Sequence, residues 1–184
     1  MKIEEVYGRY RKLLRMYIPA TGRILKTDCF NEGIGDFRNL GAALDIGGMT
    51  TYLEIDPAII ARAEARHPGV RDLRQGDIRE LPFYDETFKA LFDLSTIDHV
   101  PPSDASRAID EYWRVLVPGG RLVLVAWCST ERRDEPTDWG DGPQYFLNEA
   151  DLLEAMEGKF CVESNTIIHT GDEVYLHELI ARRI

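Results

Sequence analysis

Short apolar segments alternate with amphipathic segments through the middle of the chain, and this alternation constrains the fold most. The apolar segments are rich in β-branched and aromatic residues, which predicts strands. The segments between them carry apolar residues at helical spacing. Strands and helices joined by short connections predict a doubly wound, mostly parallel sheet with helices on both faces. The predicted strands cover residues 50–56, 88–96 and 120–128, and the helices between them cover 58–66 and 103–116.

The flanking segments extend this pattern to seven strands. Residues 3–18 have helical spacing of aromatic and aliphatic side chains, and Pro19 follows them. Asn148 or Glu149 is the expected start of a later helix. We expect residues 129–145 to form a loop. Short strands are predicted at 22–27 and 70–77, and an antiparallel pair that closes the sheet is predicted at 160–171 and 173–184.

Charge and cysteine content limit the classes of function. The 184-residue chain carries a net charge of -10, which disfavours nonspecific binding to nucleic acid or to anionic membranes. No apolar run approaches the roughly 20 residues of a membrane span. Three widely spaced cysteines, Cys29, Cys128 and Cys161, suggest neither a disulfide framework nor a metal site. We therefore expect a cytoplasmic protein without a bound metal.

Glu54 stands at the end of a predicted strand, where open parallel sheets bind their ligands. A carboxylate at this position can accept hydrogen bonds from both hydroxyl groups of a ribose. The alternative is a solvated charge at the strand end, with Asp56 acting only as the cap of the next helix.

Four segments together resemble one protein family. EIDPAIIARA, GDIRELPF, LFDLSTIDH and PGGRLVLVAW follow one another at the spacing found in class I S-adenosylmethionine-dependent methyltransferases of type 11. The resemblance covers residues 23–128 well and the last two strands loosely. It implies a Rossmann-like methyltransferase domain at 21–184, preceded by an N-terminal helix or lid at 1–20, and S-adenosylmethionine as the cofactor.

The resemblance also implies roles for residues that bind the nucleoside. Glu54 and Ile55 would meet the ribose. The Asp77 side chain would accept from the adenine amine, and the Ile78 amide would meet a ring nitrogen. Ser95 would contact the methionine part. Alternatively, Asp77 belongs to an ordinary Gly-Asp turn and binds no ligand.

The first family motif departs from the expected pattern. The family has a glycine-rich turn after its first strand, whereas this chain has Lys26, Thr27 and Asp28 there, with Asp28 or Thr27 as a possible helix cap. We expect Thr27 or Asp28 to hold the α-amino group of the cofactor and Lys26 to hold its carboxylate. A second glycine pair in LDIGG is rejected, because only five residues separate Gly48 from Glu54, too few for a crossover helix.

Catalytic and acceptor-binding residues are harder to assign. Asp98 and His99 form the one close titratable pair with a plausible acid–base role, although His99 also suits a structural role at a helix start. Aromatic residues near the predicted strand ends, and one on the N-terminal helix, are candidates for an acceptor pocket, and packing explains each of them at least as well. These aromatic residues are Tyr7, Trp127, Trp139 and Tyr145.

These features predict an enzyme that moves the methyl group of S-adenosylmethionine to a small-molecule acceptor by in-line displacement and leaves S-adenosylhomocysteine. No nucleic acid, membrane or metal is expected as a partner. A homodimer is possible if the strand at 173–184 lies at the sheet edge. The alternative is a noncatalytic methyltransferase-like binding or scaffold protein with reduced or lost cofactor affinity.

Overall fold

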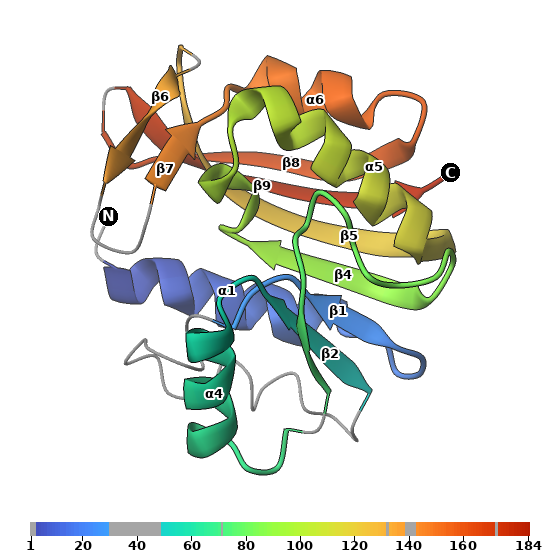
Figure 1. The fold of residues 1–184 in the computed structure, drawn as a ribbon. Helices are drawn as coiled ribbons and strands as arrows, with labels where there is room; N and C mark the ends of the chain where they lie inside the picture. Colours follow the sequence, from blue (N-terminus) through green and yellow to red (C-terminus); the bar gives the residue numbers. More distant parts are fainter. Residues whose placement is uncertain (1–2, 30–48, 71, 132, 139–142, 172) are drawn as a thin grey trace.

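The computed structural model describes residues 3–29, 49–70, 72–131, 133–138, 143–171 and 173–184. The described strands and helices are interspersed along the chain as far as α5, and strands dominate the rest (Figure 1). The elements are α1 (Ile3–Tyr17), β1 (Ile24–Lys26), β2 (Thr50–Glu54), α4 (Pro57–Arg66), β3 (Leu73–Gln75), β4 (Phe88–Leu94), η1 (Ile97–His99), η2 (Pro102–Asp104), α5 (Ala105–Val115), β5 (Leu116–Ser129), β6 (Arg133–Asp138), β7 (Pro143–Phe146), α6 (Glu149–Met156), β8 (Phe160–His169) and β9 (Val174–Arg183).

Seven strands form one sheet in the order β3-β2-β1-β4-β5-β9-β8. The first five pair in parallel, β9 runs antiparallel to β5, and β8 runs antiparallel to β9. The predicted fold class is therefore confirmed.

The position expected for the C-terminal strand is wrong. β9 lies between β5 and β8, and β8 forms the edge of the sheet. Nearly every residue of β9 is buried, whereas most residues of β8 are exposed. Burial of β9 on both faces explains its interior position, because an edge strand has fewer neighbours to cover it.

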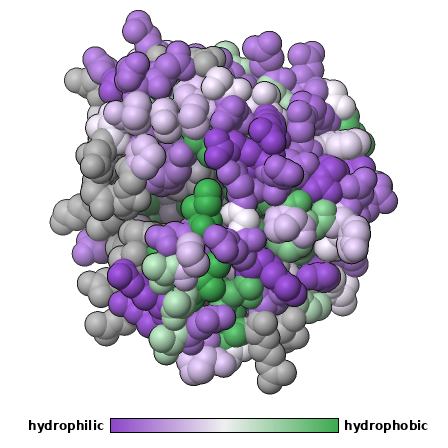
Figure 2. All heavy atoms as spheres, in the orientation of Figure 1, coloured by the Kyte–Doolittle hydropathy of each residue, from purple (hydrophilic) through white to green (hydrophobic). Residues whose placement is uncertain are grey.

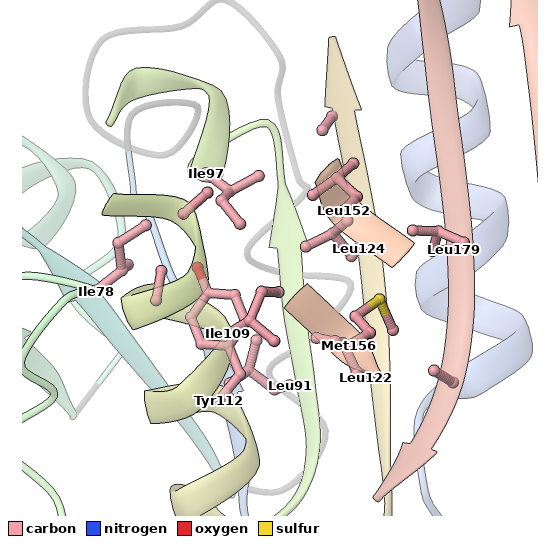
Figure 3. Packing of buried hydrophobic residues seen from close by; sticks show 14 of the residues in the cluster. Ile78, Leu91, Ile97, Ile109, Tyr112, Leu122, Leu124, Leu152, Met156 and Leu179 are labelled. Carbon is pink, nitrogen blue, oxygen red and sulfur yellow. The ribbon is translucent and has the colours of Figure 1, made fainter. Parts of the chain in front are cut away.

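Alternate side chains along each strand enter two hydrophobic clusters on opposite faces of the sheet. Leu25 of β1 points into the larger cluster, which α5 and α6 cover, and Ile24 points into the cluster that α1 covers. Figure 3 shows the larger cluster, where Ile109 and Tyr112 of α5 face Leu91 of β4. Because helices cover both faces, the central strands present polar groups only at their ends.

Local signals explain where two helices begin. The Asp56 side chain accepts a hydrogen bond of 2.7 Å from the Ala58 amide, and Pro57 occupies the first turn of α4. The Asn148 side chain accepts from the Asp151 amide at 2.8 Å and caps α6. Both helix starts agree with the sequence prediction.

The irregular turn near the start of β5 depends on two glycines. Gly119 has φ of +72°, and a Cβ at Gly120 would lie 2.7 Å from the Val117 carbonyl oxygen. Only glycine accommodates these two requirements without strain. The strand begins earlier than predicted, at Leu116, so this irregular turn lies within the bounds of β5.

Residues 129–145 are not the continuous loop that we predicted. β6 and β7 form a separate two-stranded antiparallel sheet, with Thr137 opposite Gln144. The local sequence of β6, RDEPTD, is poor in strand-forming residues. Contacts with η1 and η2 hold the hairpin, so tertiary packing overrides the local preference.

Three sequence predictions lie outside the described residues. They are Trp139, the LDIGG segment at 44–48 and the body of the helix expected after Asp28.

Among the described helices, none combines the length and the apolar character that crossing a bilayer requires. On the face drawn in Figure 2, hydrophilic residues predominate around a narrow central band of hydrophobic ones.

We expect Ile109→Ala to lower the free energy of unfolding by roughly 2–5 kcal/mol, because Ile109 is fully buried between α5 and the sheet. Ile167→Ala on β8 is the matched control, since this side chain is 37% exposed and should lose much less. Urea unfolding of both variants measures the difference. Equal losses would contradict the packing of α5 against the sheet.

Candidate functional site

The carboxyl ends of four parallel strands lie next to one another in the order β3, β2, β1 and β4. Open α/β sheets bind ligands at this edge. The residues that end or follow these strands include most of the predicted cofactor ligands. They are Asp77 after β3, Glu54 on β2, Lys26 to Asp28 after β1, and Ser95 after β4.

Glu54 is buried, and backbone amides fix its carboxylate. Oε1 accepts from Ile55 at 2.8 Å and from Asp56 at 3.1 Å, while Oε2 accepts from Cys29 at 3.3 Å. Burial raises the pKa of Glu54 and nearby Asp28 raises it further, whereas the three amides oppose the shift. The carboxylate therefore has a fixed orientation and joins the end of β2 to the turn after β1.

Lys26 occupies the position where the family has its first motif, and its side chain is completely buried. Its ammonium donates to the Asp28 carbonyl oxygen at 2.6 Å and to Asp28 Oδ2 at 3.1 Å. A buried ammonium needs such partners, because burial of an unpaired charge is costly. The ion pair thus stabilises a turn in which Lys26, Thr27 and Asp28 stand in place of the expected glycines.

Hydroxyl groups connect the turn after β1 to the end of β4. Thr27 Oγ1 donates to Thr96 Oγ1 at 2.9 Å, and Thr96 Oγ1 donates to Asp28 Oδ2 at 3.4 Å. The Ser95 hydroxyl shares a 2.5 Å hydrogen bond with Tyr10 of α1. Ser95 also has φ of +67°, a conformation that costs energy for a residue other than glycine and is often found at functional sites.

Asp77 is already engaged with an arginine. Arg79 donates to both Asp77 carboxylate oxygens, with a shortest distance of 2.6 Å, and also donates to Asp104 at 2.8 Å. The Arg79 hydrogen bonds lower the pKa of Asp77. Ile78 is buried beside it, whereas the Ile55 side chain is 60% exposed at the end of β2.

The Asp98 carboxylate lies fully buried beneath the β6–β7 hairpin. Its Oδ2 accepts from Gln144 Nε2 at 2.5 Å and from the Trp127 amide at 3.3 Å. Its Oδ1 is buried without a hydrogen-bond partner among the described residues. Burial raises the pKa of Asp98, and the His99 charge opposes that shift.

His99 is partly exposed, and β7 orients its ring. His99 Nδ1 lies 2.9 Å from the Pro143 carbonyl oxygen, which can only accept, so Nδ1 carries a proton. In the neutral ring Nε2 is then the basic nitrogen. Neighbouring residues of the hairpin, Pro143 and Gln144, thus position His99 and Asp98 separately.

The predicted aromatic residues have different surroundings. Tyr7 packs edge-on against Tyr10, with ring centroids 5.5 Å apart. Trp127 on β5 and Tyr145 on β7 are partly buried next to the Asp98–Gln144 pair. Both therefore lie near the strand ends, whereas Trp139 is outside the described residues.

Asp93, one residue before the end of β4, organises the turn below this site. Its carboxylate accepts from the amides of Thr96 and Ile97 and from the Tyr112 hydroxyl, the last at 2.5 Å. Burial raises its pKa to about 7, and the charge of Asp98 also raises it. Asp93 therefore joins β4, η1 and α5.

Together these residues can hold a nucleoside with a charged tail. The fixed Glu54 carboxylate can accept from a further hydroxyl at Oε2, and exposed Ile55 offers an apolar surface beside it. Asp28 offers an acceptor to a cationic group. Among the described residues, no three His, Cys, Asp or Glu side chains are grouped closely enough to hold a metal ion.

A family model described as a methyltransferase domain matches residues 31–124, which is half of the chain. The chain belongs to this family, the type 11 group of class I methyltransferases. The predicted family is therefore confirmed, and S-adenosylmethionine is the cofactor of this family.

Individual relatives agree with this membership. A protein of Mycolicibacterium smegmatis named a probable S-adenosylmethionine-dependent methyltransferase is 29% identical over 159 residues, which cover 84% of this chain and 59% of the relative. The chain thus spans just over half the length of this curated relative.

Solved structures share the fold at lower identity. A [4+2]-cyclase, SpnF, superposes with a TM-score of 0.76 at 19% identity, covering 100% of this chain and 83% of the other. A geranyl diphosphate C-methyltransferase from Streptomyces coelicolor, in complex with Mg²⁺, geranyl diphosphate and S-adenosyl-L-homocysteine, has a TM-score of 0.72 at 14% identity and covers 96% of this chain and 77% of the other.

The sequence did not indicate several polar partners in this region. Gln144 lies in a segment predicted as a loop, so nothing pointed to its contact with Asp98. Arg79 follows Asp77 by two residues, so its positive charge could have predicted the ion pair between them. The contact of Tyr10 with Ser95 spans 85 positions and depends on how α1 packs.

The raised pKa of Asp93 predicts a pH dependence of stability. The folded state holds the proton up to about pH 7, whereas an unfolded aspartate releases it near its ordinary pKa of 3.8. Ionisation of Asp93 therefore weakens the fold as the pH rises from 4 through 7. Relative to Asp93→Asn, which cannot ionise, the free energy of unfolding of the unchanged protein should fall between pH 5 and pH 8.

Urea unfolding of both proteins at these two pH values measures the effect, and carboxylates that do not interact with Asp93 cancel in the difference. A difference that stays constant or grows with pH would show that the amides and Tyr112 stabilise the ionised form instead.

Proposed function

We propose that the chain binds S-adenosylmethionine and transfers its methyl group to a small-molecule acceptor by in-line displacement. The observation that carries the proposal is the buried Glu54 carboxylate at the carboxyl end of β2, held by three amides beside the turn after β1. Membership of the methyltransferase family supports this reaction.

Glu54 is proposed to hold the ribose. The carboxylate has about four acceptor directions, so the three amide hydrogen bonds leave Oε2 able to accept from one ribose hydroxyl. Ile55, 60% exposed, would pack against the nucleoside. Asp77 and the Ile78 amide are proposed to meet the adenine, with Arg79 holding the Asp77 carboxylate ionised and oriented.

The turn after β1 is proposed to bind the methionine end. Asp28 would accept from the α-amino group, with Thr27 and Ser95 alongside it. Lys26 orients Asp28 through two hydrogen bonds. Its positive charge would also attract the carboxylate of the cofactor's methionine part. Polar side chains would thus perform the work that backbone amides of a glycine-rich turn perform elsewhere in the family.

The cofactor supplies a methyl group on a sulfonium, which is already a good leaving group, so positioning contributes much of the catalysis. His99 is proposed to accept a proton from the acceptor through Nε2, since Nδ1 is held by Pro143. Asp98 Oδ1, which has no hydrogen-bond partner in the described part of the chain, is proposed to help bind or orient the acceptor. Tyr7, Trp127, Trp139 and Tyr145 are proposed as walls of the acceptor pocket.

A small-molecule acceptor is supported by two observations. The chain carries a net charge of -10, which disfavours nucleic acid and anionic membranes. One structural neighbour is a methyltransferase in complex with geranyl diphosphate. We also propose a cytoplasmic location. A homodimer, if it forms through strand pairing, would use the exposed edge β8.

A noncatalytic binding protein is the second candidate. The Lys26–Asp28 ion pair fills the turn where the family's glycines approach the cofactor. One neighbour that shares the fold is named a cyclase, so the fold is not restricted to methyl transfer.

Titration of the purified protein with S-adenosylmethionine and S-adenosylhomocysteine, followed by calorimetry, separates the two candidates. The first predicts binding of both ligands with dissociation constants in the micromolar range, about -8 kcal/mol. Absence of binding by either ligand at millimolar concentration would rule out the proposed enzyme and favour the noncatalytic candidate.

Glu54→Ala and Asp77→Ala should each weaken binding of S-adenosylhomocysteine by about 1–3 kcal/mol, because each removes a charged hydrogen-bond acceptor. Glu64→Ala, on the exposed surface of α4, removes one carboxylate away from the strand ends and serves as the control. Calorimetry gives the three affinities. If Glu54→Ala and Asp77→Ala bind as tightly as Glu64→Ala, the nucleoside site lies elsewhere.

A further inference from the structure

A hollow lies at the amino ends of β4 and β5, at the opposite end of the strands from the candidate cofactor site. It has a volume of about 250 Å³. The last turn of α1, the first residues of β4 and the glycine turn of β5 surround it. The lining residues are Tyr17, Pro19, Lys89, Ala90, Val117, Pro118, Gly119, Gly120, Arg121 and Arg182.

Two arginines in this lining face each other across neighbouring strands. Arg121 of β5 pairs in register with Arg182 of β9. Like charges directly opposite each other destabilise a sheet unless an opposite charge compensates them. Glu163 of β8 supplies one such charge, accepting from Arg121 at 3.3 Å and also from Arg182. One carboxylate therefore serves two guanidinium groups.

Lys89 adds a third cation. Its ammonium donates to the Thr21 hydroxyl at 3.2 Å, and it forms no ion pair with any described residue. Three cationic groups thus face one carboxylate, which leaves about two positive charges at the hollow. The carbonyl end of α1 offsets at most about half a unit of this charge. This local excess of positive charge attracts anions, although the chain as a whole carries a net charge of -10.

The rest of the lining is uncharged and largely apolar. Arg121 lies over the Tyr17 ring, 5.0 Å from its centroid, and this contact fixes the guanidinium at the wall. Pro19, Val117 and Pro118 offer nonpolar surface beside the cations. A ligand that suits both parts has a compact dianionic head and a small organic body.

We propose that this hollow binds a small phosphomonoester, with Lys89, Arg121 and Arg182 around the phosphate and the organic part against Tyr17 and the proline residues. Arginine and lysine are the side chains that bind phosphate most effectively. The site is separate from the proposed cofactor site, because the six residue steps from Lys89 to Ser95, just past the end of β4, span about 20 Å.

Calorimetric titration with glycerol 3-phosphate at constant ionic strength tests the proposal. We expect binding that Lys89→Gln weakens about tenfold, the usual effect of losing one charged hydrogen bond. Lys89→Glu, which reverses the charge, should abolish it. Lys12→Gln on the exposed face of α1 makes the same change of charge outside the hollow and should leave binding unchanged. Circular dichroism confirms that each variant is folded.

Three results would overturn the proposal. They are absence of binding up to about 10 mM glycerol 3-phosphate, equal weakening in Lys12→Gln and Lys89→Gln, and binding of inorganic phosphate as tight as that of the ester. Because the titration contains no S-adenosylmethionine, its outcome is independent of the proposed methyltransferase function.

Discussion

Burial of the central strand β4 on both faces is the constraint on which the rest of the structure depends. Leu91 packs under α5, whereas Ala90 and Phe92 pack toward α1, so neither face of the strand has room for a ligand. The polar side chains of β4, Lys89 and Asp93, consequently lie near its two ends. At the carboxyl end, Asp93 uses a buried carboxylate to join β4 to η1 and to Tyr112 of α5.

The two ends of the strands differ in character. Carboxylates gather at the carboxyl end, where amides, hydroxyls and one buried ammonium fix them. Cations gather at the amino end, where Arg121 and Arg182 share one carboxylate. The same sheet can therefore offer a nucleoside site at one end and an anion site at the other, separated by the length of β4.

Local patterns were sufficient for most of the fold. The β-branched and aromatic residues of β2, the caps Asp56 and Asn148 and the glycine turn before residue 121 act within a few positions, so their consequences can be deduced from the sequence. The hairpin β6–β7 and the interior place of β9 could not be deduced, because contacts with elements distant in the sequence decide both. The same holds for the candidate site: Glu54 is visible as an acid at a strand end, whereas its three amide donors are not.

The sequence by itself determined the family, the sheet of seven strands and the positions of Glu54 and Asp77, because periodicity and short motifs carry that information locally. The tertiary structure decided the partners of the charged groups. Lys26 turns to Asp28, Asp77 to Arg79 and Asp98 to Gln144, and Arg121 comes to lie opposite Arg182. Burial makes the partners of Lys26 and Asp98 necessary, since a charge removed from water must find a partner, and only the folded chain brings that partner within reach.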